Sequence, residues 1–268
     1  MKVVLFCGGQ GMRIREVTDR VPKPMVRIGD RPILLHVMKY YAHFGHTEFI
    51  LCLGYQGHVI KEYFLNYREA LLNDFVLTNG GKTIDLLASD IQDWRITFVD
   101  TGLNSNVGQR LRAVRDLIGP DEMFLANYAD GLTDLPLPEM VSNLTASDKI
   151  GTFICVRPSY SFHVVRLGDG DAVKDIEPLA DSGIWINGGY FTFRREIFDY
   201  INEGEELVEE PFRRLIGQGK LLAHRYEGFW TAMDTFKDLQ RLEGLYDSGK
   251  RPWAVWQDPR FGGTGPRC

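Results

Sequence analysis

Residues 3–13 read Val3-Val4-Leu5-Phe6-Cys7-Gly8-Gly9-Gln10-Gly11-Met12-Arg13. An apolar run of the kind found in strands buried on both faces leads directly into closely spaced glycines. Glycines at such a point let backbone N–H groups approach an anion, so we expect a phosphate-binding loop after a buried strand. The spacing fits neither G-x-G-x-x-G nor G-x-x-x-x-G-K-[ST], which disfavours a dinucleotide oxidoreductase and a P-loop NTPase.

Similar apolar runs follow through the first half of the chain, at residues 49–53, 96–99 and 123–126. They alternate with segments of helical period at residues 33–41 and 58–72, which predicts a parallel sheet joined by crossover helices. Residues 73–94 are rich in turn formers and show weak periodicity, so we expect an excursion from the layers there.

The pattern changes after residue 150 to shorter strand-like runs at residues 152–156, 164–167, 190–193 and 221–226. Helical stretches are predicted near residues 195–202, 207–217 and 236–247. No linker rich in proline or serine divides the chain, so we expect an α/β fold with one continuous, mixed, mainly parallel sheet over residues 1–256. Residues 257–268 are predicted to be a loose tail.

The composition excludes several classes of protein. The 268 residues are 44% hydrophobic and carry a net charge of -5, which disfavours a disordered chain and offers no basic field for nucleic acid. No apolar run is long enough for a membrane span, and we expect no signal peptide. Cys7, Cys52 and Cys155 each lie in an apolar run without a C-x-x-C pair, which predicts a reduced, cytoplasmic protein without structural zinc.

Lys23 lies between two prolines, in Pro22-Lys23-Pro24-Met25-Val26. The prolines restrict the backbone and so fix the direction of the ammonium group, which suits phosphate binding. The alternative is a solvated lysine in an ordinary loop. We expect Lys23 to be an exposed loop residue that contributes little to stability.

These motifs together resemble the N-terminal signature of the sugar-1-phosphate nucleotidylyltransferases, and later ones resemble the glucose-1-phosphate cytidylyltransferase branch. The motifs that carry the resemblance are Gly8-Gly9-Gln10-Gly11-Met12-Arg13, Pro22-Lys23-Pro24-Met25-Val26, Gly29-Asp30-Arg31-Pro32-Ile33-Leu34, Val99-Asp100-Thr101-Gly102, Asn187-Gly188-Gly189-Tyr190 and Met233-Asp234-Thr235. The resemblance implies a Rossmann-like fold, a nucleotide-binding half (1–150), an acceptor-binding half (151–256) and a homo-oligomer. It also implies transfer of a nucleotidyl group, CMP from CTP, to a sugar 1-phosphate, with release of pyrophosphate.

The resemblance also assigns roles to individual residues. Arg13 and Lys23 are the expected catalytic residues, and Asp130 and Asp234 the expected ligands of Mg²⁺ or Mn²⁺. The residues implied to bind the nucleotide are Gly8, Gly9, Gly11, Met12, Arg13, Lys23, Gly108 and Arg110, and those implied to bind the acceptor are Tyr128, Glu177, Asn187 and Gly188.

The chemistry is consistent with the residue types. Asp130 follows an apolar strand, at the end where open α/β sheets bind ligands, and two carboxylates suit a magnesium ion that also takes phosphate oxygens. Taken alone, each aspartate is more simply interpreted as a turn residue or a helix cap. A sugar phosphate is mostly dianionic at neutral pH, so its oxygen needs no general base.

Three departures from the branch pattern leave alternatives open. Gln109 stands where the branch has a glycine, Ser161 where it has an arginine, and Pro178 where it has a lysine. The same chemistry with another nucleoside triphosphate or another phosphorylated acceptor is one alternative, and a nucleotide-binding subunit without turnover is another. His163, Arg166 or Lys174 are candidates for replacement contacts to the acceptor.

Overall fold

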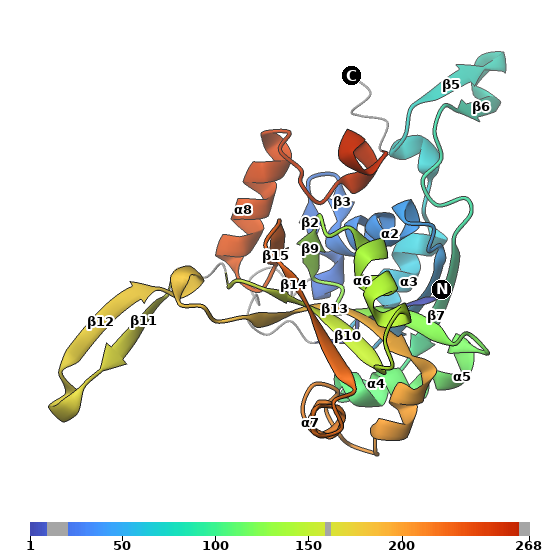
Figure 1. The fold of residues 1–268 in the computed structure, drawn as a ribbon. Helices are drawn as coiled ribbons and strands as arrows, with labels where there is room; N and C mark the ends of the chain where they lie inside the picture. The colour runs from blue at the N-terminus through green and yellow to red at the C-terminus, as the bar shows by residue number, and fades with distance from the viewer. Residues whose placement is uncertain (10–20, 159–161, 263–268) are drawn as a thin grey trace.

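The computed structural model describes residues 1–9, 21–158 and 162–262. A seven-stranded sheet in the order β14-β10-β13-β8-β1-β4-β7 forms its centre (Figure 1). The strands are β1 (Val3–Phe6), β4 (Glu48–Leu53), β7 (Arg95–Asp100), β8 (Met123–Asn127), β10 (Gly151–Val156), β13 (Ile186–Arg194) and β14 (Leu221–Tyr226). Each corresponds to a strand predicted from the sequence.

Strand direction creates one common edge for ligands. β1 pairs in parallel with β4 and β8, β4 with β7, and β10 with β14, whereas β13 runs antiparallel to both of its neighbours. The carboxyl ends of all the other strands therefore meet the amino end of β13 at one edge. The predicted single, mainly parallel sheet is confirmed.

Helices cover both faces of this sheet, which explains why inner strands such as β1 are apolar without alternation. Val3 and Leu5 of β1 pack in a core with α2 (Ile33–His43), α3 (Gly57–Leu65), α6 (Leu137–Thr145) and α8 (Phe236–Asp247). Val4 and Phe6 pack in a second core with α4 (Val107–Ala113), α5 (Arg115–Ile118), the 3₁₀ segment η7 (Arg195–Tyr200) and α7 (Glu210–Gly217). Burial of both faces is typical of parallel sheets.

The second helix is shorter than predicted. α3 ends at Leu65, and only a 3₁₀ turn, η3 (Glu69–Leu71), follows within the predicted range of 58–72. Asn66 ends the helix, because its side-chain amide donates to the carbonyl of Glu62 at 2.9 Å. Side-chain hydrogen bonds of this kind compete with continuation of a helix.

Two hairpins project from the body in different directions (Figure 1). The first, β5 (Phe75–Thr78) and β6 (Thr83–Leu86) joined by η4 (Asn79–Gly81), occupies the predicted excursion, and all residues of its strands are exposed. The second consists of β11 (His163–Leu167) and β12 (Val173–Pro178), with η5 (Asp169–Asp171) between them and η6 (Leu179–Asp181) after them. Only β11 was expected from the sequence.

Short ladders support the ligand edge. β2 (Arg27–Ile28) pairs with β3 (Arg31–Pro32), after the 3₁₀ turn η2 (Lys23–Met25), and β9 (Gly131–Thr133) pairs with β15 (Trp230–Ala232). None of these pairs was predicted, because two or three residues leave no periodicity to detect.

The start of the expected tail is anchored, not loose. Residues 255–261 form two 3₁₀ turns, η8 (Val255–Gln257) and η9 (Pro259–Phe261). The Phe261 ring packs against the first core, and its carbonyl lies 2.9 Å from His43 Nε2. The tail prediction is therefore wrong for residues 257–262, and residues 263–268 lie outside the described part.

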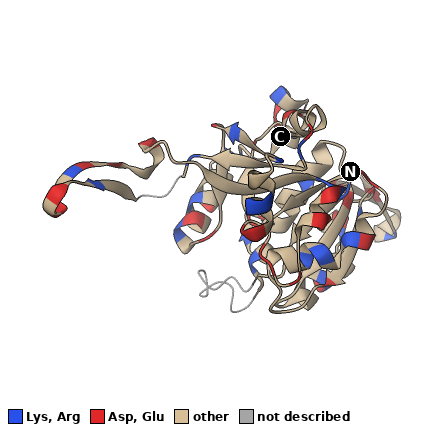
Figure 2. Ribbon diagram, turned by 60° about the horizontal axis from the view of Figure 1, so that its bottom comes forward, with Lys and Arg blue, Asp and Glu red and all other residues tan. Residues whose placement is uncertain are grey.

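The surface and the helices agree with the composition. Acidic and basic residues are interspersed over the ribbon, without a field of one sign (Figure 2). Within the described residues, no helix has the length and apolar character required to cross a membrane.

Candidate active site

Asp130 and Asp234 are brought together by the β9–β15 ladder. Gly131 pairs with Ala232, so the residues next to this pair also face each other, and the Met233 N–H donates to the Asp130 carbonyl at 2.9 Å. Asp234 then precedes α8, whose N-cap Thr235 forms a capping box with Asp238. The ladder and the cap fix both aspartates at the ligand edge of the sheet.

Lys23 lies between the two aspartates. Its Nζ is 2.7 Å from Asp130 Oδ2 and 2.7 Å from Asp234 Oδ1. Pro22 is extended at ψ 150° and Pro24 lies in the 3₁₀ turn, so the prolines restrict the backbone on both sides as predicted. The side chain is only 14% exposed, so the expectation of an exposed loop lysine is wrong.

The electrostatics of the three groups are interdependent. Burial raises the pKa of Asp130, and the ion pair with Lys23 offsets only part of that rise. Burial alone would lower the pKa of Lys23, but the two carboxylates outweigh it and raise that pKa. A cation at this point therefore favours the ionised form of the buried carboxylate.

The backbone before Asp130 adopts an uncommon conformation. Ala129 has φ +61°, in the left-handed region that residues with a Cβ rarely enter. The buried Asn127 side chain stabilises it, because Asn127 Oδ1 accepts from the Ala129 N–H at 2.6 Å. This turn lets the chain leave β8 and enter β9 with Asp130 at the junction.

The glycine loop begins at the end of β1, but only Gly8 and Gly9 lie within the described residues. The Gly8 carbonyl accepts from Arg110 Nη2 at 3.1 Å and from the Tyr55 N–H at 3.3 Å. A Cβ on Gly8 would overlap the Arg110 guanidinium, which explains the glycine. The predicted contributions of Gly11, Met12 and Arg13 concern positions outside the described residues.

Arg110 is buried beneath this loop. Its guanidinium donates to the carbonyls of Leu53 and Gly8 and to the Thr101 hydroxyl, at 2.7–3.1 Å. Burial lowers its pKa. These bonds tie the ends of β1 and β4 together, so Arg110 supports the loop from below.

The residues around Arg110 have structural roles in α4. Gln109 Oε1 accepts from the Asn106 N–H, and Asn106 Oδ1 accepts from the Gln109 N–H, which makes a capping box. Gly108 packs so closely on the Glu205 carbonyl that a Cβ would clash. The substituted Gln109 is therefore engaged in capping the helix.

Three of the four predicted acceptor residues lie together. Asn187 Nδ2 donates to the Tyr128 hydroxyl at 3.2 Å, and Trp230 Nε1 donates to the Gly188 carbonyl at 2.8 Å. Gly189 has φ +75° and lies against the Tyr128 ring. The amino end of β13 is thereby joined to the carboxyl end of β8, next to Asp130.

Glu177 is the predicted acceptor residue that lies elsewhere. It is on β12 of the second projecting hairpin, where its Oε1 accepts from Arg166 Nη2 at 2.6 Å. His163 and Lys174, also considered for the acceptor, lie on the same hairpin and are exposed. The hairpin extends away from the body in the views of Figures 1 and 2.

The donor set at Lys23 fits a small, hard cation. Oxygen atoms of two carboxylates converge on one cationic atom at 2.7 Å each. Among the described residues no group of three or more His, Cys, Asp or Glu side chains could hold a metal. Two carboxylates nevertheless suffice for Mg²⁺, which completes its shell with substrate phosphate oxygens and water.

Sequence reasoning missed a further set of polar side chains at this edge. Arg157, Trp185 and Arg225 lie near the ends of β10, β13 and β14. A lone arginine after an apolar run, as at Arg157, was the available signal. It is a weak signal, because the three residues are far apart in the sequence.

The fold defines a class. A mixed, mainly parallel sheet with helices on both faces is the architecture of the nucleotide-sugar transferase fold. A solved structure of apo UDP-glucose pyrophosphorylase superposes with a TM-score of 0.69 at 18% identity, covering 94% of this chain and 100% of that chain.

Sequence comparison identifies the family. Residues 2–248 match the model of the nucleotidyl transferase family, and the chain belongs to that family. It is 39% identical to the probable glucose-1-phosphate cytidylyltransferase of Bacillus subtilis, over 96% of this chain and 100% of that protein. It is 38% identical, with the same coverage, to the glucose-1-phosphate cytidylyltransferase of Salmonella typhimurium.

Proposed function

We propose that this protein transfers CMP from CTP to a sugar 1-phosphate, giving a CDP-sugar and pyrophosphate. The observation that carries the proposal is the position of Lys23, 2.7 Å from both Asp130 and Asp234 where the strands end. The cytidylyltransferase relatives, matched over 96% of this chain, support the choice of CTP and of a sugar phosphate.

In this proposal the protein accelerates the reaction by positioning and charge stabilisation. Lys23 is a catalytic residue whose ammonium, displaced from the two carboxylates when the metal ion binds, contacts the reacting phosphates. Asp130 and Asp234 hold Mg²⁺ or Mn²⁺, which supplies positive charge to the triphosphate when bound. The glycine loop, with Gly8, Gly9, Gly11, Met12 and Arg13, binds the phosphates that leave as pyrophosphate.

No general base is required for the attack. The second pKa of a phosphate monoester is near 6, so the acceptor oxygen already carries negative charge at neutral pH. The protein must only hold the acceptor in line, and we assign that role to Tyr128, Asn187 and Gly188. Glu177 stays a prediction that requires the hairpin to approach the site.

In this proposal Gly108 and Arg110 contribute to nucleotide recognition indirectly, because they fix the position of nearby backbone groups. Arg110 fixes the Gly8 carbonyl, and Gly108 allows α4 to pack against residue 205. Recognition of cytosine therefore depends on loop backbone groups as well as on side chains.

Two further properties belong to the proposal. The buried free thiols of Cys7, Cys52 and Cys155 support a reducing, cytoplasmic environment. Leu77 of the first hairpin and Val173 of the second are 57% and 63% exposed, which supports a homo-oligomer in which such residues become covered.

A pyrophosphate-release panel tests the function. It crosses CTP, GTP, UTP and dTTP with several sugar 1-phosphates, with Mg²⁺ and with a chelator. We expect release that requires CTP, an acceptor and the metal ion together. Faster turnover with another nucleoside triphosphate contradicts the CTP assignment, and nucleotide binding without any turnover favours the non-catalytic subunit.

A further inference from the structure

Two arginines converge on one tryptophan in the acceptor half. Arg157 Cζ lies 4.2 Å from the centre of the Trp185 ring, and Arg225 Cζ lies 5.6 Å from it. Arg157 follows the last residue of β10, Trp185 precedes β13, and Arg225 is the penultimate residue of β14. All three are therefore at the edge of the sheet that carries the proposed active site.

Strand register places these side chains on one face. Cys155 pairs with Asn187 on one side and with Arg225 on the other, so Asn187, Cys155 and Arg225 form a row across three strands. Arg157 is two residues from Cys155, and Trp185 two residues from Asn187, which puts both on the same face. The row continues to β8, because Asn187 contacts the Tyr128 hydroxyl.

Among the described residues, no carboxylate balances the charges of the two arginines. Neither Arg157 nor Arg225 forms an ion pair with a carboxylate in the described part of the chain. Within the same residues, Arg157 Nη1 is buried and has no hydrogen-bond partner. A buried donor without an acceptor is destabilising, and two nearby cations repel each other, so an anion at this point would relieve both costs.

The distance between the two arginines and Asp130 indicates which end of the acceptor the arginines would contact. β10 is the second strand from β8 and β14 the third, in the order β14-β10-β13-β8. At roughly 4.8 Å between neighbouring strands, the arginines lie about 10–14 Å along the edge from β8, the strand that leads to Asp130. This distance compares with the length of a hexose phosphate, so the arginines face the end of the acceptor that is remote from the reacting phosphate.

We propose that the acceptor carries a second anionic group, a carboxylate or a phosphate, which binds to Arg157 and Arg225. The inference rests on the proposed function and specifies its acceptor. The two guanidinium groups select a doubly charged acceptor by forked, charge-assisted hydrogen bonds.

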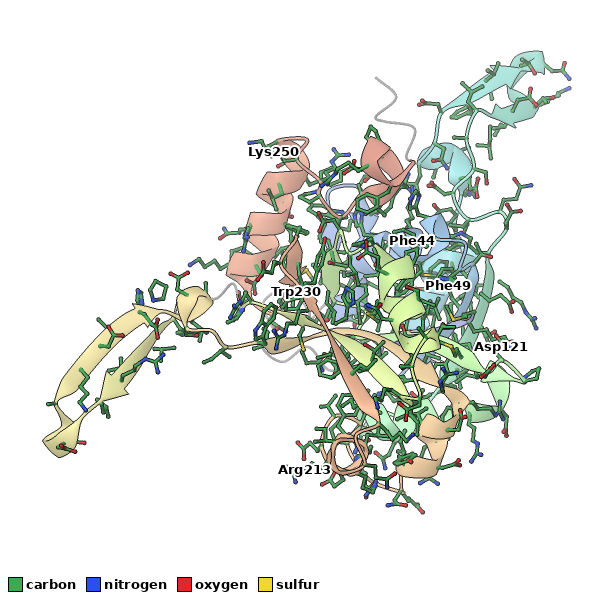
Figure 3. All side chains as sticks on the ribbon, viewed as in Figure 1. Phe44, Phe49, Asp121, Arg213, Trp230 and Lys250 are labelled. Atoms are coloured by element: carbon green, nitrogen blue, oxygen red, sulfur yellow. The ribbon has the colours of Figure 1, made fainter. Side chains whose placement is uncertain are left out.

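The test compares acceptors with one and with two anionic groups. Glucose 1-phosphate, glucuronic acid 1-phosphate and glucose 1,6-bisphosphate are assayed with CTP, and each is also titrated alone by calorimetry. The variants are Arg157→Gln, Arg225→Gln and the double variant. The matched control is Arg213→Gln, an exposed arginine on α7, well away from Trp230 (Figure 3).

We expect the wild type to use at least one of the doubly anionic acceptors with a kcat/KM at least 10-fold above that of glucose 1-phosphate. The double variant should lose roughly 10- to 100-fold with that acceptor and under 3-fold with glucose 1-phosphate, because each charge-assisted bond lost costs about a factor of ten. Preference for glucuronic acid 1-phosphate identifies a carboxylate, and preference for the bisphosphate identifies a phosphate.

Failures of the two proposals are distinguishable. Turnover of glucose 1-phosphate with no advantage for either doubly anionic acceptor overturns the second anionic site and leaves the transferase function intact. If no acceptor is turned over, the transferase proposal fails, and calorimetry then tests the second anionic site by itself. Weaker binding of glucuronic acid 1-phosphate or the bisphosphate to the double variant than to Arg213→Gln supports the site, and equal binding overturns it.

Discussion

Arg110 and Arg157 both place a guanidinium at the same edge of the sheet, one in residues 1–150 and one in residues 151–256. Arg110 is 4% exposed and donates to two carbonyls and a hydroxyl of the protein. Arg157 stacks on Trp185 and has a buried Nη1 without a partner among the described residues. Satisfied polar groups hold a site in shape, whereas unsatisfied ones are available to a ligand.

The same contrast extends to the other charges of the two halves. Lys23 and Asp130 of the first half and Asp234 of the second form ion pairs with one another, so the two halves are joined by groups to which we also assign roles in the proposed reaction. Changes there should affect both folding and chemistry. Changes at Arg157 or Arg225 should affect use of the acceptor but not folding, and the predictions on the aspartates, Lys23 and the two arginines test this difference.

The largest effect is expected for the two aspartates. Asp130→Asn or Asp234→Asn should each lower kcat roughly 100-fold or more at saturating Mg²⁺, the scale expected when a several-kcal/mol electrostatic contribution is lost. Steady-state pyrophosphate release measures it, with the exposed Asp199→Asn as control. Turnover close to that of the wild type in either variant would contradict the assignment of that aspartate as a metal ligand.

Lys23→Ala should lower turnover by a similar factor and should also destabilise the fold. Without the ammonium, two largely buried carboxylates repel each other, at a cost of about 1–2 kcal/mol after allowance for their partial exposure. The unfolding temperature should fall by roughly 3–6 °C for a chain of this size. The exposed Lys174→Ala is the control.

Addition of Mg²⁺ sharpens the Lys23 prediction. The ion should raise the unfolding temperature of Lys23→Ala more than that of the wild type, because it replaces the missing cation between the carboxylates. An unchanged unfolding temperature in the variant would instead support the sequence-based expectation of a lysine without a structural role.

Arg110→Gln and Arg157→Gln compare the two arginines directly. Loss of Arg110 leaves the Leu53 and Gly8 carbonyls and the Thr101 hydroxyl without their donor, and should lower the free energy of unfolding by about 2 kcal/mol. Loss of Arg157 should change it by less than about 0.5 kcal/mol, because the lost stacking on Trp185 is offset by removal of the buried Nη1 donor that has no acceptor among the described residues. Urea denaturation measures both, and equal losses would contradict the comparison.

The smallest effect is a pH dependence from His36. The ring is buried and neutral, because Nε2 donates to the Ile28 carbonyl at 3.0 Å while Nδ1 accepts from Trp253 Nε1 at 3.3 Å. Burial lowers the pKa of His36 to about 4. Protonation would place a second donor against the indole N–H.

The sign follows from the two pKa values of His36. The unfolded state takes up a proton below its ordinary pKa of about 6.5, whereas the folded state does so only near 4, so stability falls as the pH falls between these values. The loss between pH 7 and pH 5 should be about 1–2 kcal/mol. His36→Gln should lack this share of the pH dependence, and parallel urea profiles for variant and wild type would refute the assignment.

The sequence was sufficient to predict the strands of the central sheet, but not the short strand pairs outside it. β1, β4, β7 and β8 were predictable because burial on both faces demands a continuous apolar run. β5 and β6 were not, because their residues are exposed and nothing imposes a period. The spacing of Asn106 and Gln109 would have revealed a capping box and so the structural use of Gln109.

Some residues of the site could be predicted from local sequence, whereas others come together only through the pairing of distant strands. The prolines around Lys23 and the strand before Asp130 gave local signals, and the family resemblance supplied Asp234. The convergence of Arg157, Trp185 and Arg225 depends on the register of β10, β13 and β14, which no single segment of sequence encodes.

The β9–β15 ladder also determines when the site can exist during synthesis. Asp130 leaves the ribosome before the strand that pairs with β9, and Trp230–Ala232 and Asp234 come late in the chain. The parallel strands β1, β4, β7 and β8 can collapse early, but the nascent chain then holds a lysine and one carboxylate where the finished protein has two. The protein can therefore assemble the cluster of Lys23, Asp130 and Asp234 only near the end of translation, as one of its last long-range contacts.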